Sequence, residues 1–155
     1  LLAKSGGSGG ANPWTHQVRT TAFTNSTTNM AQVFPGFTPD VGGRYIIDAL
    51  LMVQSAATTT GIKTLLYTPY DSVFDASVKV ITAATATTDR IDHVTADQSS
   101  EPTVGLTIPN LLLFQAIFTF TPNFEVLPVY IAAASEISGS LVTVHPGSSM
   151  RWRKI

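Results

Sequence analysis

Apolar and polar residues alternate with a period of two along most of the chain, and this period is typical of β-strands. Polar turns, or turns rich in Pro and Gly, separate short segments with this pattern, and no long segment has the period of an amphipathic helix. The segments are residues 14–23, 44–54, 62–68, 72–83, 90–94, 111–121, 126–134, 140–145 and 150–155. We therefore predict an all-β fold, an antiparallel sandwich or barrel of about eight to ten short strands.

Residues 44–54, RYIIDALLMVQ, form the most apolar of these segments. The run is short, contains three β-branched residues, and lies between Gly-Gly and a turn rich in Thr. These features favour a strand buried on both faces over a helix. In a strand, Asp48 shares a face with Ile46, Leu50 and Met52.

The composition narrows the class of protein. The chain has 155 residues, enough for one domain with a core, and only 12% of them are charged against a usual share of about 25%. The 22 Thr and 13 Ser residues indicate a polar rather than an ionic surface. The net charge of −1 does not suggest a nucleic-acid partner, and the absence of cysteine excludes disulfides and thiol catalysis. No apolar run approaches the roughly 20 residues of a membrane-spanning helix, so we expect no membrane insertion.

The N-terminus has a different composition from the rest of the chain. It reads LLAKSGGSGG, whose apolar part is too short for a signal peptide. Gly and Ser in this density are typical of a flexible linker. We expect residues 1–13 to form a flexible arm or linker and residues 14–155 to form a single β-sandwich domain. Because the first residue is Leu rather than Met, we also expect a processed product or a fragment of a longer protein.

Asp48 is the residue that the strand pattern explains least, and three roles are open for it. It could pair with an Arg or accept backbone N–H groups inside the sandwich, it could pair across a subunit seam, or it could be a catalytic acid. The C-terminal segment SMRWRKI supplies candidate partners, because Arg151 and Arg153 share one face of a strand and Trp152 lies on the other. Asp48, Arg151, Trp152 and Arg153 are our candidate subunit-interface residues.

The residues do not indicate an enzyme or a cofactor site. His16, His93 and His145 lack the close spacing of a metal motif, and the cluster DRIDH at residues 89–93 favours a solvated loop or an edge strand. There is no Gly-x-Ser-x-Gly elbow, and no carboxylate pair of the kind that a glycosidase needs stands out. We therefore expect no catalytic residue, no metal and no cofactor.

Three segments resemble a family of tailed-bacteriophage virion proteins, the β-sandwich module near the C-terminus of tail-fibre-like and structural proteins. The segments are PWTHQVRTTAF, GRYIIDALLMVQSAATTTGIKTLLYTP and VYIAAASEISGSLVTVHPGSSMRWRKI. The matching positions are Gly9, Gly10, Trp14, Thr15, Tyr45, Asp48, Ala49, Leu50, Leu51, residues 55–60, Gly61, Ser135, Glu136, residues 141–144, Gly147, Ser148 and residues 150–155. Residues 70–110 do not align. The resemblance implies a jelly-roll-like sandwich, often a homotrimer, with an adhesive or structural role and no catalytic residue.

Two functions follow from this resemblance, both on the surface of a phage particle and in contact with other virion proteins. One is the tail-fibre or spike module that touches a glycan or protein of the host surface. For it, the candidate binding residues are Tyr67, Tyr70, Asp71 and Phe74, because aromatic and acidic side chains in loops stack on sugars and hydrogen-bond to them. The alternative is a capsid decoration or cement protein that stabilises the head shell.

Overall fold

The computed structural model describes residues 13–67, 73–81, 90–94, 107–119 and 128–155, with the backbone alone for 73–81 and 90–94. Over these ranges the chain contains strands and no helix, and every strand pairing is antiparallel. Accordingly, no helix in this part of the chain is long and apolar enough to cross a membrane. The predicted all-β fold is confirmed.

Eight of the strands have four residues or more: β1 (Thr15–Val18), β4 (Arg44–Ser55), β5 (Ile62–Tyr67), β6 (Val73–Ile81), β7 (Arg90–Val94), β8 (Asn110–Thr119), β9 (Tyr130–Ser135) and β11 (Ser149–Lys154). Three shorter strands are added to them: β2 (Phe23–Asn25), β3 (Ala31–Gln32) and β10 (Val142–Val144). The predicted segment 14–23 is interrupted before β2, whereas the predicted segments 140–145 and 150–155 correspond to β10 and β11. The expected number of eight to ten strands is close to the eight longer and three shorter strands of the structure.

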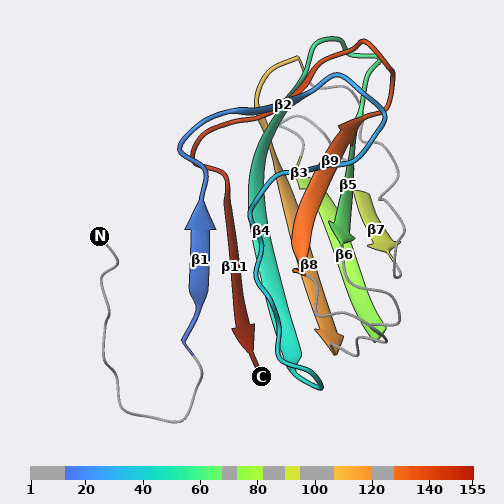
Figure 1. Cartoon of the computed structure of the whole chain (residues 1–155). Coiled ribbons are helices and arrows are strands. Elements are labelled where there is room, and N and C mark those ends of the chain that lie inside the picture. Colours follow the sequence, from blue (N-terminus) through green and yellow to red (C-terminus); the bar gives the residue numbers. More distant parts are fainter. Residues whose placement is uncertain (1–12, 68–72, 82–89, 95–106, 120–127) are drawn as a thin grey trace.

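The strands form two sheets (Figure 1). The large sheet has the order β1-β11-β4-β8-β6-β7, with β10 and β2 continuing beside the end of β4, and the small sheet has the order β3-β9-β5. The chain passes repeatedly from one sheet to the other, from β3 to β4 to β5 to β6 and from β8 to β9 to β10. This alternation, with the first strand beside the last, gives the jelly-roll-like sandwich that we expected.

Strand β4 is buried on one face only. Its inward side chains are 0–6% exposed from Tyr45 to Val53, whereas Leu50 and Met52 on the other face are 41% and 37% exposed. The expectation that this strand is buried on both faces is wrong. The apolar run suggested two covered faces, but the small sheet covers only the inward one.

An aromatic cluster closes one end of the core. The Phe37 ring stacks on the Trp152 ring at a centroid distance of 4.6 Å and lies 5.3 Å from the Tyr45 ring. Tyr45 in turn stacks on Phe118 at 5.6 Å, and its hydroxyl accepts a hydrogen bond from the backbone N–H of Asp40. Trp152 therefore packs against the core, on the face of β11 opposite Arg151 and Arg153.

The turn between β10 and β11 sets the register of the C-terminal strand. Residues 145–148 stand opposite only two residues of β4, Leu51 and Met52, so the ladder is interrupted there. The Met52 backbone N–H donates instead to the buried Ser148 hydroxyl, and the Met52 carbonyl accepts from His145 N–H. Gly147 takes a φ of 88°, which glycine adopts without a steric penalty. This bulge sets the register of β11 against β4, in which Arg151 is opposite Asp48.

Candidate functional site

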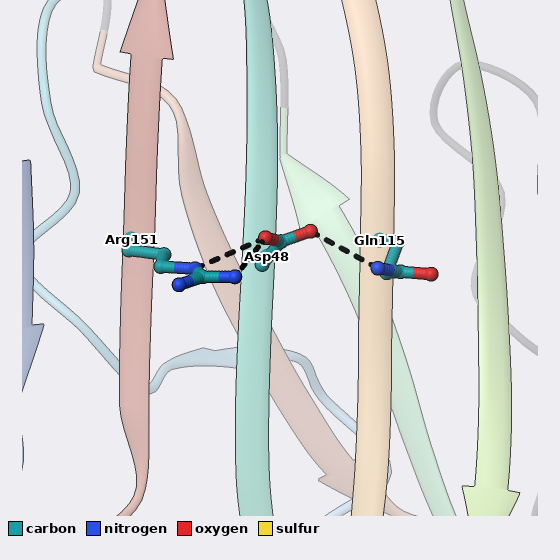
Figure 2. A network of polar contacts seen from close by, with 3 residues as sticks. All are labelled: Asp48, Gln115 and Arg151. Atoms are coloured by element: carbon teal, nitrogen blue, oxygen red, sulfur yellow. Dashed lines mark hydrogen bonds and ion pairs between the residues drawn. The ribbon is translucent and has the colours of Figure 1, made fainter. Parts of the chain in front are cut away.

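The outer face of the large sheet carries a polar row across its strands. Arg151 on β11, Asp48 on β4 and Gln115 on β8 are register neighbours, and their side chains share the solvent side of the sheet. The Arg151 guanidinium donates from Nε and Nη2 to Asp48 Oδ2 at 3.0 and 2.8 Å. Gln115 Nε2 donates to Asp48 Oδ1 at 3.2 Å (Figure 2). A pairing of Asp48 with the C-terminal strand, one of the roles that the sequence left open, is therefore present, with Arg151 as the cation.

This pair lies on the outside of the sandwich rather than inside it. The Asp48 side chain is 16% exposed and the Arg151 side chain is 56% exposed. A hollow of about 300 Å³ lies beside it, lined by Leu50, Leu113 and Ser149 together with the three polar residues. Both oxygens of Asp48 accept hydrogen bonds, and no second carboxylate among the described side chains lines the hollow, so the geometry fits a structural ion pair better than an acid catalyst.

We expect Asp48→Ala to lower the free energy of unfolding by about 1–2 kcal/mol. A fully buried pair would cost more, but the Arg151 guanidinium can be hydrated once its partner is gone. Asp48→Asn should cost less, because an amide keeps the shape and one acceptor. Urea midpoints at a fixed protein concentration measure both changes. A control is Lys154→Ala, which breaks the pair with Asp40, whose side chain is 71% exposed, and should change the midpoint less. Equal midpoints for Asp48→Ala and wild type would contradict the structural role of Asp48.

Trp14 stacks against the two C-terminal arginines. The Arg151 and Arg153 guanidinium carbons lie 4.6 and 4.9 Å from the centroid of the Trp14 ring. Stacking on an aromatic face is favourable for a guanidinium, which is planar and weakly hydrated. The sequence analysis missed this contact. The contact depends on the antiparallel pairing of β1 with β11, which places Trp14 beside Arg153.

Three loops at one end of the sandwich form a second candidate surface, which we call the three-loop apex. It consists of residues 26–29, 56–61 and 136–141, which lie at the top of Figure 1. Backbone hydrogen bonds of 2.7–3.0 Å join the loops to one another and to the end of β9: Gly139 N–H to Ser26 O, Ala56 N–H to Leu141 O, Ser135 N–H to Thr27 O and Glu136 N–H to Gly61 O. The apex is therefore one braced surface rather than three independent loops.

Side chains brace the apex further. Thr60 Oγ1 and Ser140 Oγ are 2.7 Å apart, and Glu136 Oε2 accepts from the Gly61 N–H at 3.0 Å. The Asn25 amide donates to the carbonyls of Asn29 and Ala133, which fixes the first loop against the small sheet. The exposed remainder is rich in hydroxyl and amide groups, and Glu136 is the only ionisable residue in these three loops. Such a surface can hydrogen-bond a neutral, hydroxylated ligand.

Of the predicted binding residues, Tyr67 is fully described, and it lies away from the apex. Tyr67 ends β5, whose other end, Ile62, adjoins the apex, so roughly 17 Å separate Tyr67 from it. The Tyr67 ring stacks on the Tyr130 ring at 4.6 Å, and burial together with Tyr67 raises the pKa of Tyr130. Tyr70 and Asp71 lie outside the described residues, and for Phe74 only the backbone position in β6 is described. The sequence analysis placed residues 26–29, 56–61 and 136–139 between predicted strands, but it did not bring these loops together.

No family model and no curated protein sequence matches the chain. Solved structures with some likeness are those of infectious bursal disease virus. The Gt strain is 13% identical at a TM-score of 0.24, with 93% of this chain and 38% of that chain covered. The VP2 subviral particle is 13% identical at 0.26 (92% and 41%), and the Gx strain is 14% identical at 0.22 (94% and 37%). This chain thus spans about two fifths of their length, and TM-scores this low carry no argument for its function.

Proposed function

We propose that the chain is a non-enzymatic structural protein of a bacteriophage virion, and within it the tail-fibre or spike module that contacts the host cell surface. The observation that carries this proposal is the three-loop apex. Binding residues concentrate on loops that a rigid scaffold positions, and here three loops far apart in the sequence are locked into one exposed surface. The sequence resemblance to tail-fibre-like modules supports the same function.

The chemistry of the apex favours a neutral glycan of the host surface as the ligand. Exposed hydroxyl and amide groups of Thr28, Asn29, Thr58 and Ser138 can exchange hydrogen bonds with sugar hydroxyls. Ile137 and Leu141 are 45% and 42% exposed and add apolar surface for the C–H faces of a sugar ring. No Lys or Arg lies in these loops, so an acidic glycan fits them less well.

A capsid decoration or cement protein is the second candidate. The observation that favours it is the outer face of the large sheet, where Leu50, Leu111 and Ile117 are 37–43% exposed. Such a surface is suited to lasting contact with another protein. In that case the sheet would dock on the shell and the apex would have no ligand.

The two candidates differ in where the chain lies and in what its apex does. Immunogold labelling of virions that carry the chain should place the label on the tail, and label over the head would favour the decoration protein. The purified chain should also block phage adsorption to host cells. A variant with Thr28→Arg and Ser138→Arg should lose this competition. Val41→Arg, at a 68% exposed position outside the apex, should keep it. Absence of competition by the wild-type chain would overturn the host-contact function.

A further inference from the structure

The outer face of the large sheet presents an aliphatic patch on two adjacent strands. Its residues stand in register pairs across β4 and β8: Ile46 with Ile117, Leu50 with Leu113, and Met52 with Leu111. Leu50, Met52, Leu111 and Ile117 are 41%, 37%, 37% and 43% exposed. Exposed aliphatic side chains of this kind, on both sides of the polar row of Asp48, are typical of a protein–protein contact.

We propose that a second copy of this chain covers the patch. A two-fold axis relates the two copies; it lies between the two facing sheets, parallel to the strands, over the line midway between β4 and β8. This axis places β4 over β8 of the partner and β11 over β6 of the partner. Residues that are register neighbours within one chain then face each other between chains. Ile46 faces the partner's Ile117, Leu50 faces the partner's Leu113, and Met52 faces the partner's Leu111. Each contact occurs twice, as an isologous interface requires.

The charges select a copy of the chain as the occupant. In the same arrangement, Asp48 faces the partner's Gln115, and the position of Arg151 lies opposite that of the partner's Ser77. The register runs Arg153, Ile46, Ile117, Asp75 across the sheet, so the position of Arg153 lies opposite that of the partner's Asp75. Within the described part of its own chain, the Arg153 guanidinium has no carboxylate partner, and its Nε makes no hydrogen bond. In these rows no charge faces a like charge, so the face complements itself.

The available area is sufficient for a dimer of moderate affinity. Four strands about 4.8 Å apart, each with about nine residues rising ~3.3 Å, cover roughly 600 Å² per copy. Two copies bury about 1,200 Å², which is the lower end of the range for specific interfaces. The resemblance to tail-fibre-like modules implies a trimer instead. A three-fold axis, however, does not place β4 of one copy over β8 of another and, at the same time, β8 of the first over β4 of the second.

A charge exchange between Arg153 and Asp75 tests the two-fold arrangement. Strands β4 and β8 separate the two residues within one chain, by about 14 Å, so they do not pair there. In sedimentation equilibrium of the full chain at micromolar concentrations, wild type should be a dimer. Arg153→Asp and Asp75→Arg should each weaken association at least about tenfold, because like charges then face each other. The double variant should restore it.

Two matched substitutions control for surface hydrophobicity. Leu50→Asp, in the patch, should give a monomer, whereas Leu141→Asp, similarly exposed on the apex at 42%, should leave the dimer intact. Circular dichroism checks that each variant folds. A monomeric wild type, a trimer, or a double variant as weak as its parents would overturn the proposal. The proposed dimer does not depend on the proposed host contact. Adsorption competition tests the three-loop apex, whereas sedimentation equilibrium tests the outer face of the large sheet.

Discussion

Gly36→Ala is expected to lower the free energy of unfolding by about 2–5 kcal/mol, since it adds backbone strain to a steric clash. Gly36 has a φ of +76°, which an L side chain rarely adopts. A Cβ at this position would lie 2.2 Å from the Val129 carbonyl oxygen and 2.8 Å from the Tyr130 Cβ. The Gln17 side-chain amide also forms two hydrogen bonds with the backbone of Gly36: its NH2 group donates to the Gly36 carbonyl, and its oxygen accepts from the Gly36 N–H. The loop therefore cannot move away from β9 without breaking these contacts.

Gly42→Ala separates the cost of backbone strain from the cost of the steric clash. Gly42 has nearly the same φ, +74°, but nothing lies within 4 Å of the position its Cβ would take. It should cost only the conformational strain, about 1–2 kcal/mol. Urea unfolding at one protein concentration measures both variants. If Gly36→Ala costs no more than Gly42→Ala, the close approach of residue 36 to Val129 is contradicted.

Phe114→Ala is expected to lower the free energy of unfolding by about 3–5 kcal/mol. Phe114 is 0% exposed on the inner face of β8, at the centre of the large sheet, where its register neighbours are Ala49 and Val78. Two small or medium-sized neighbours cannot expand to fill the space that a lost ring leaves, so a cavity remains.

The matched control for the cavity is Ile108→Ala. Ile108 is 61% exposed just before β8, so its truncation should stay within about 0.5 kcal/mol. Thermal unfolding monitored by circular dichroism compares the two variants with wild type. A loss for Phe114→Ala as small as that for Ile108→Ala would mean that β8 does not face the core with this register.

The faces of the strands were predictable because alternation is a local property. The pattern of residues 44–54 assigned Tyr45 and Ile47 to one face and Asp48 and Leu50 to the other, and the structure has these faces. Local sequence could not say how many faces are covered, because that depends on whether a second sheet or a second chain lies against each. The aliphatic side chains of β4 therefore suggested burial where the described chain leaves them exposed.

From the sequence, the cation that pairs with Asp48 could be narrowed to Arg151 or Arg153, but the sequence does not decide between the two. The two arginines share a face of one strand, and only the register of β11 against β4 decides which is opposite Asp48. That register depends on the bulge at residues 145–148, where Ser148 replaces a ladder partner of Met52. A bulge inserts residues without a strong sequence signature, so the sequence left both cations open.

By itself, the sequence determined the fold class, the strand faces and the low charge of the surface, since each follows from residue types and their spacing. Tertiary structure alone decided which loops meet at the apex, that Trp14 stacks against the arginines of β11, and that Gly36 must lie against Val129. These features join residues more than 70 positions apart, and the path of the chain between the two sheets brings them together. Local propensity carries no information on that path, because contacts so distant in sequence are set by the packing of the whole sandwich.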